Sequence, residues 1–222
     1  MTLIRVTAGS APGADHLALG KNLQDAAAAW TDGTTACGVV SDGCGSGRHS
    51  EVGAHLTVAV GLRVLASAEV PLEEVPRLVL SEVVRALGGI VDAVAPRDRR
   101  AFVEDALSAT LLGFLVRGEG AVVFGVGDGT VWLGDEVVVL DQGGRPQVPA
   151  HALFGGRVSP FERVVPAPSA LPVGVATDGV PACFRPELSR CRGDLTRHLV
   201  LLGRRGLLAD DGAVAVATWG GP

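Results

Sequence analysis

The sequence contains no tyrosine, a single methionine and a single lysine, Lys21, and aromatic residues make up only 4% of its 222 residues. Arginine therefore supplies nearly all of the positive charge, which we interpret as codon bias rather than function. The Gly-x-x-x-x-Gly-Lys-Ser/Thr pattern of Walker-type nucleotide sites is absent, which argues against such a site. Cys-x-x-Cys pairs and the spacings of zinc sites are absent too, so we expect reduced thiols at Cys37, Cys44, Cys183 and Cys191.

Long apolar runs and a dense basic patch are also missing. Charge or glycine interrupts each apolar stretch well short of the roughly 20 residues that a membrane helix needs, and the N-terminus lacks a basic region followed by an apolar core. The net charge of −5 provides no general attraction for nucleic acid or an anionic membrane. Hydrophobic residues, at 47%, allow a sizeable core. We expect a cytoplasmic protein with a single domain over residues 1–222 and no nucleic-acid or membrane partner.

Two long helices are expected between a first group of strands and a second. Residues Ser50 to Ala68 place four apolar side chains on one helical face, namely Val52, Leu56, Val60 and Val64. Pro71 begins a second helix, whose apolar stripe consists of Val75, Leu78, Val79, Val83, Leu87, Ile90 and Val94. A late helix is expected over Leu195 to Leu202, beginning near Asp194. Strands, then two helices, then more strands are typical of an α+β fold.

Short β-type runs follow the second helix, separated by Gly-rich or Asp-Gly turns. They are Ala109–Val116, Ala121–Val126, Thr130–Leu133 and Glu136–Leu140. This pattern predicts an antiparallel meander. A further short strand is expected at Arg163 to Val165, and a closing strand at Ala213 to Thr218.

Aspartate followed by glycine ends one strand-like run after another. This occurs at Asp42, Asp128 and Asp178, and the pair Asp210-Asp211 stands just before the last run. Carboxylates at strand ends can converge from distant parts of a sequence onto one hard cation. A metal site is therefore the first hypothesis.

Asp-Gly is also a turn signal, because glycine tolerates positive φ and aspartate bonds its own backbone. Asp32-Gly33 lies between two strand-like runs, and we interpret it as a hairpin turn. A turn explains Asp128 almost as well as a metal site does, and both interpretations stay open for Asp42, whose run continues into a glycine loop. After Asp178, Pro181 opposes continuation of a strand, which favours a functional role.

Six short segments span nearly the whole chain in order: Asn22–Ala26, Val39–Gly47, Ser108–Leu112, Gly125–Gly129, Ala176–Val180 and Asp210–Ala213. Taken together they resemble the Asn-x-Asp, Asp-Gly-x-Gly, Gly-Thr-Thr, Gly-Asp-Ser, Ser-Asp-Gly and Asp-Asn/Asp-x-Thr motifs of the metal-dependent protein phosphatase 2C family. The spacing of His16, Gly20 and Gln24-Asp25 is similar to that of the shorter bacterial branch of this family. Each motif is weak alone, but the ordered set is specific.

The resemblance implies a four-layer αββα sandwich, in which helices flank two antiparallel β-sheets and a two-metal centre lies at one end. Two Mg²⁺ or Mn²⁺ ions are implied, with a possible third. The implied ligands are Asp42, which bridges the two ions, the carbonyl of Gly43, Asp178 and Asp210, with Asp128 at the accessory third position. Asp25 is implied to hold metal-bound water. Asp211 is the alternative to Asp210 as ligand.

The resemblance also implies a reaction, the hydrolysis of phosphoserine or phosphothreonine on proteins by attack of a metal-bridging water. Two ions roughly 3.5–4 Å apart lower the pKa of a shared water and hold the phosphoryl oxygens. The implied partners are phosphorylated proteins and a serine/threonine kinase of the same signalling system.

Two positions depart from the family pattern. The arginine that often binds phosphate before the first aspartate is missing, and His16 and Lys21 are the candidate phosphate-binding residues in its neighbourhood. Cys44 occupies the position of a histidine general acid. Arg48 is either a substrate contact or an ordinary surface arginine. These departures keep open an alternative function, a catalytically weak phosphatase-like module that regulates or binds phosphoproteins.

Overall fold

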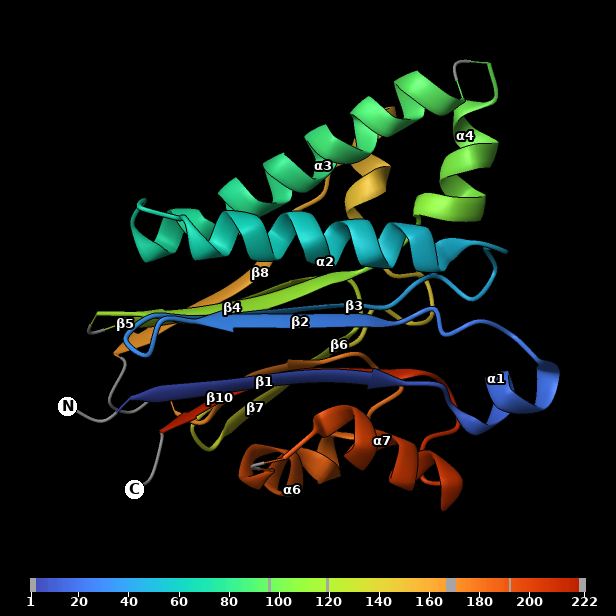
Figure 1. The fold of residues 1–222 in the computed structure, drawn as a ribbon. Helices are drawn as coiled ribbons and strands as arrows, with labels where there is room; N and C mark the ends of the chain where they lie inside the picture. Colours follow the sequence, from blue (N-terminus) through green and yellow to red (C-terminus); the bar gives the residue numbers. More distant parts are fainter. Residues whose placement is uncertain (1–2, 96, 119, 167–170, 192, 220–222) are drawn as a thin grey trace.

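The computed structural model describes residues 3–95, 97–118, 120–166, 171–191 and 193–219, and the statements below concern these residues. Figure 1 shows two β-sheets packed face to face, with helices covering the outer face of each. The predicted four-layer αββα sandwich is therefore confirmed.

Each sheet has five strands, and all neighbouring strands are antiparallel. In spatial order, the first sheet consists of β1 (Ile4–Ala11), β10 (Gly212–Trp219), β9 (Val173–Ala176), β6 (Gly129–Leu133) and β7 (Glu136–Leu140). The second consists of β2 (Ala26–Thr31), β3 (Ala36–Ser41), β4 (Leu111–Arg117), β5 (Gly120–Val126) and β8 (Phe161–Pro166). The strands expected at 163–165 and 213–218 are confirmed as parts of β8 and β10.

The expected single meander over residues 109–140 is wrong in its pairing. β4 pairs with β5 and β6 pairs with β7, but the two hairpins belong to different sheets. The second neighbour of β5 is β8, and that of β6 is β9, so the chain crosses from one sheet to the other at Gly127 and Asp128. Local alternation identifies strands, whereas the sheet that each joins depends on partners much later in the chain.

Helices α2 (Ser50–Ala66) and α3 (Val75–Val94) cover the sheet of β2 to β8, while α6 (Arg185–Arg190) and α7 (Leu195–Arg204) cover the other (Figure 1). Helix α1 (Ala14–Leu19) connects β1 to β2 at one end of the sandwich. The shorter helical segments are η1 (Leu72–Glu74), α4 (Arg99–Phe102), η2 (Val103–Leu107), η3 (Pro149–Phe154) and η4 (Ala182–Phe184). Asp194 caps α7 where predicted, because its side chain accepts a hydrogen bond from the Arg197 amide.

The buried face of α2 agrees only in part with the expected stripe, of which Val64 is buried and Leu56 and Val60 are partly buried. Val52 is 42% exposed, whereas Gly53, Ala54 and Gly61 are buried. A Cβ atom at Gly53 would lie 2.7 Å from the Cα of Leu107, so only glycine allows the two backbones to approach this closely. Apolar residues occur all round α2, and the small ones mark the face that packs most closely.

Three apolar layers fill the spaces between the four structural layers. On β3, Val39 packs toward α2 and α3, and the next residue, Val40, packs toward the facing sheet. Trp132 on β6 belongs to the third layer, together with Leu195 and Leu199 of α7. Both faces of the central strands are therefore buried, whereas the edge strands β7 and β8 are largely exposed, and most of the polar residues that remain inside lie near the strand ends.

Candidate metal centre

Asp25 and Asp42 lie side by side at one end of the sandwich. Asp42 follows the last residue of β3 and Asp25 precedes the first residue of β2, and the register of these strands pairs Ala26 with Ser41. In an antiparallel pair, one strand begins where its neighbour ends. The two carboxylates are therefore neighbours although 17 positions separate them in the sequence.

Asp178 and Asp210 reach the same end from the other sheet. Asp178 follows β9 by one residue, Asp210 precedes β10, and Val214 of β10 pairs with Ala176 of β9. The charges of Asp178 and Asp210 act on Asp42 across the two sheets. The sandwich therefore brings together four of the carboxylates that the sequence singles out, one from each of four strand ends.

The cluster carries uncompensated negative charge. Burial and the charge of Asp178 raise the pKa of Asp42 to about 6. Burial and the charge of Asp42 raise the pKa of Asp25, which is 2% exposed, well above its ordinary range. Partial desolvation and the charges of Asp210 and Asp128 raise the pKa of Asp178, although the residue is exposed at the surface.

The donor chemistry of the cluster fits divalent cations. The carboxyl groups of Asp25 and Asp42 are close enough for each to affect the pKa of the other. Among the described residues, no ion pair joins Asp25, Asp42 or Asp178 to a lysine or arginine. Hard oxygen donors that repel one another are the ligands that Mg²⁺ and Mn²⁺ neutralise best.

Thr177, which the sequence analysis did not single out, holds Asp25 in place. Its hydroxyl donates to Asp25 Oδ2 at 2.6 Å and accepts from the amide of Ala213 at 2.8 Å. The side chain is fully buried at the junction of β9 and β10. A polar residue between an apolar run and an aspartate is the signal that could have identified it.

Asp210 and Asp211 occupy different environments. The side chain of Asp210 is 69% exposed, whereas that of Asp211 is 2% exposed. The Asp211 carboxylate accepts hydrogen bonds from the backbone amides of Gly13 at 2.9 Å and Gln24 at 2.7 Å. Asp211 therefore joins the segment before α1 to the segment before β2.

Asp128 lines a cavity of about 360 Å³ together with Asp178 and Asp141. Its Oδ1 atom accepts a hydrogen bond from the backbone amide of Gln142 at 2.7 Å. Asp128 is only 9% exposed, so it does not have the environment of an ordinary residue in a surface turn. Asp32, by contrast, is exposed and bonds the amides of Thr34 and Thr35, which confirms the predicted turn.

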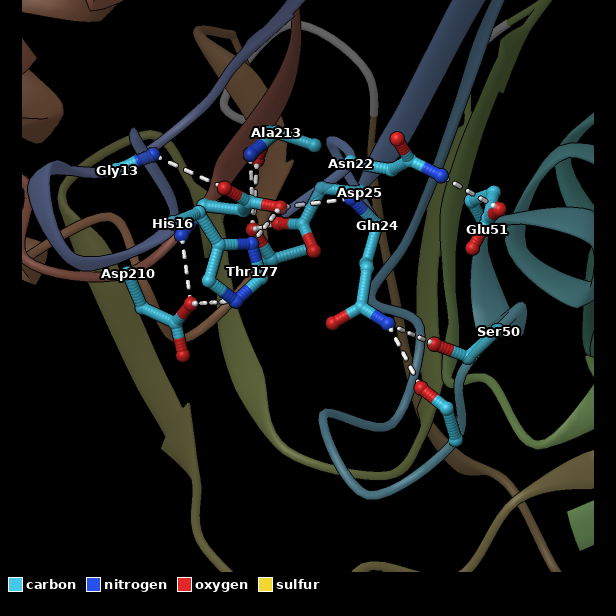
Figure 2. Close-up of polar contacts among 12 residues, drawn as sticks. Gly13, His16, Asn22, Gln24, Asp25, Ser50, Glu51, Thr177, Asp210 and Ala213 are labelled. Atoms are coloured by element: carbon cyan, nitrogen blue, oxygen red, sulfur yellow. Dashed lines mark hydrogen bonds and ion pairs between the residues drawn. The ribbon is translucent and has the colours of Figure 1, made fainter. Parts of the chain in front are cut away.

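The two candidate phosphate-binding residues are placed differently. His16 is buried, and its ring nitrogens face Asp210 and Asp211 (Figure 2). Lys21 is exposed and lines a second cavity, of about 430 Å³, between the α1–β2 connection and the glycine loop after Asp42. Arg48, which follows the glycine loop, also lines this cavity, and its guanidinium is bonded to Asp105.

Gly43 is fixed by close packing. Its amide donates to the carbonyl of Gln24 at 3.2 Å, and a Cβ atom at this position would lie 2.8 Å from the backbone of Ser50. Glycine is therefore required where the chain leaves β3 and Asp42. Cys44 lies beyond it, with its sulfur 3.2 Å from the Ser46 hydroxyl.

The sequence profile of the family described as protein phosphatase 2C matches residues 12–152, which include Asp25, Asp42 and Asp128. The chain belongs to the protein phosphatase 2C family. Members of this family are metal-dependent hydrolases that act on phosphoserine and phosphothreonine, so the chain is an enzyme of this class, and its partners are phosphorylated proteins. No finding supports the alternative of a catalytically weak binding module.

Solved structures share the fold of this phosphatase over nearly its whole length. The serine/threonine phosphatase Stp1 from Staphylococcus aureus is 13% identical, has a TM-score of 0.72, and the match covers 99% of this chain and 96% of Stp1. The catalytic domain of the phosphatase PstP, in complex with two manganese ions, is 18% identical, with a TM-score of 0.66 and coverage of 98% and 99%. PppA of Pseudomonas aeruginosa is 16% identical, with a TM-score of 0.69 and coverage of 99% and 100%.

No curated protein matches the phosphatase in sequence. In the described part of the chain, the helices are too short or too polar for any of them to cross a membrane.

Proposed function

We propose that this phosphatase holds two Mg²⁺ or Mn²⁺ ions through Asp42, the carbonyl of Gly43, Asp178 and Asp210. The observation that carries the proposal is the mutual effect of the carboxylates, because the charges of Asp178 and Asp210 raise the pKa of Asp42. Asp210 is preferred to Asp211 because its side chain is exposed, whereas the Asp211 oxygens are occupied by backbone amides.

The bound ions supply a water of lowered pKa and positive charge for the phosphoryl oxygens. We assign Asp25 the role of orienting this water when the ions are bound, because its buried carboxyl lies beside Asp42 at the same end of the sandwich. Thr177 keeps Asp25 oriented through the hydrogen bond to Oδ2. Asp128 is assigned to an accessory third ion, and its shared cavity with Asp178 and Asp141 supports this assignment.

For substrate binding we assign Lys21 and Arg48, which line one cavity beside the glycine loop. Two cations that line one cavity, of which Arg48 also pairs with Asp105, suit the phosphoryl group or an acidic residue next to it. His16 was also a candidate for phosphate binding, and this role stays a prediction. Its buried position between two carboxylates favours a different role.

We further propose that the substrates are phosphorylated by a serine/threonine kinase of the same signalling system, that the protein acts in the cytoplasm, and that residues 1–222 form one catalytic domain. The packing of α2 on one sheet, of the two sheets on each other and of α7 on the second sheet supports the single domain, since the three apolar layers together hold all four structural layers.

The test compares the wild type with Asp42→Asn and Asp178→Asn in manganese-dependent hydrolysis of an aryl phosphate and of a phosphothreonine peptide. Asp32→Asn is the matched control, because asparagine keeps the hydrogen bonds that Asp32 makes in its exposed turn. We expect both centre variants to lose at least 100-fold in turnover and the control to retain it. Full activity in both centre variants contradicts the proposal, and phosphopeptide binding by the wild type without turnover favours a binding module.

A further inference from the structure

His16 lies between two adjacent aspartates, Asp210 and Asp211, and Figure 2 shows its ring beside the first of them. Its Nδ1 atom is 2.7 Å from Asp211 Oδ2, and its Nε2 atom is 3.4 Å from Asp210 Oδ1. The imidazole is 9% exposed, so water does not compete freely for either nitrogen. The ring is buried and polar, and both of its nitrogens face carboxylates.

The contacts of Asp211 determine which nitrogen of His16 carries hydrogen. Asp211 is an acceptor, since the amides of Gly13 and Gln24 donate to its two oxygens. The short contact to Asp211 therefore requires His16 Nδ1 to donate, which leaves the lone pair of a neutral ring on Nε2. Two backbone amides hold Asp211 in place, so the hydrogen bond from His16 fixes the orientation of the imidazole ring as well as its tautomer.

In the neutral ring, the contact on the other side joins two acceptors, His16 Nε2 and Asp210 Oδ1. Asp210 Oδ1 already accepts a hydrogen bond from the Asp211 amide at 2.8 Å, and its separation from Nε2 is long for a hydrogen bond. The ligand atoms that His16, Asp210 and Asp211 can offer all lie within 4.8 Å of one another. The Nε2 lone pair of His16 faces the carboxylate of Asp210, which belongs to the candidate cation site. A cation bound to both atoms would give each of them a partner.

The structure assigns His16 Nε2 as a nitrogen ligand of the ion that Asp210 binds. This inference rests on the proposed metal centre and extends it, because the ligand set described above contains oxygen alone. Asp211, His16 and the ion form a carboxylate–histidine–metal arrangement, in which the carboxylate orients the ring and raises its basicity. An imidazole ligand favours Mn²⁺ and other transition ions over Mg²⁺ at this position.

Pulsed electron paramagnetic resonance of the Mn²⁺-loaded phosphatase tests the assignment without any activity measurement. We expect a ¹⁴N coupling of directly bound imidazole, which changes to that of ¹⁵N when histidine alone is labelled. His16→Gln is expected to remove the coupling and to lower the ratio of Mn²⁺ to Mg²⁺ affinity about 10-fold or more. His55→Gln, at an exposed position of α2, is the matched control and is expected to keep both properties.

The outcomes separate this inference from the proposed centre. Manganese that binds without histidine coupling in the wild type overturns the assignment of His16 and leaves the carboxylate ligands in place; His16 then only orients Asp210. A wild type that binds no manganese overturns the proposed centre itself. The labelled wild type decides the question even where His16→Gln does not fold.

Discussion

Replacing Asp42 by asparagine is expected to stabilise the metal-free protein at neutral pH and to remove its response to manganese. In the folded chain the pKa of Asp42 is about 6, against an ordinary value of 3.8, because of burial and the charge of Asp178. A difference of about 2 pKa units corresponds to about 3 kcal/mol. Asparagine has nearly the same shape and carries no charge, so it removes this repulsion.

The sign follows from proton linkage. Because the folded-state pKa is raised, the folded chain binds the proton of Asp42 more tightly than the unfolded chain does. The free energy of unfolding therefore falls as pH rises from about 4 to about 6, and the full cost is present above that range. Asp42→Asn is expected to add about 1–3 kcal/mol at pH 7.5 and close to nothing at pH 4.

The assay is thermal unfolding in EDTA at the two pH values, repeated at pH 7.5 with manganese. The expected gain corresponds to a rise in Tm of about 2–10 °C for a chain of this size. Manganese at 100 times its Kd adds about 2.7 kcal/mol to the wild type, and much less to the variant, which has lost a ligand. A variant less stable than the wild type in EDTA at pH 7.5, or an equal difference at both pH values, refutes the reasoning.

Three further predictions concern the supports of the centre. Gly179→Ala places a Cβ atom 1.8 Å from the carbonyl oxygen of Asp211, so we expect lower stability and, by calorimetry, weaker manganese binding. The control is Gly89→Ala in α3, where the glycine is exposed with open space around it, and we expect this change to be neutral or stabilising by up to about 1 kcal/mol. Equal effects of the two substitutions contradict this prediction. Thr177→Val leaves Asp25 and a buried amide without a hydroxyl partner and is expected to cost about 1–3 kcal/mol in denaturant unfolding; an unchanged midpoint contradicts this. EDTA is expected to abolish hydrolysis reversibly, with activity regained on adding manganese and not calcium.

Much of the fold follows from local sequence. The Asp32-Gly33 turn, the start of α7 after Asp194 and the strand at 163–165 are confirmed, because each depends on local sequence. In the first two a side chain bonds the backbone two or three positions away, and the third contains two adjacent β-branched valines. The stripe on α2 is confirmed only in part: Val64 is buried and Leu56 and Val60 pack against the core, but Val52 is exposed. The buried face of α2 is selected by how closely the backbone of residue 107 approaches, and periodicity does not record such a distance.

The sequence by itself determined the class of fold, the family and the aspartates at the strand ends, because these depend on residue type and order along the chain. Only the tertiary structure decided how they are used. Strand register brings Asp25 next to Asp42, crossing between sheets adds Asp178, and backbone amides occupy Asp211 while Asp210 stays exposed. The sequence could not predict that His16 lies between those two aspartates, because 194 positions separate it from Asp210. The two residues meet only because α1 packs against the segment that leads into β10.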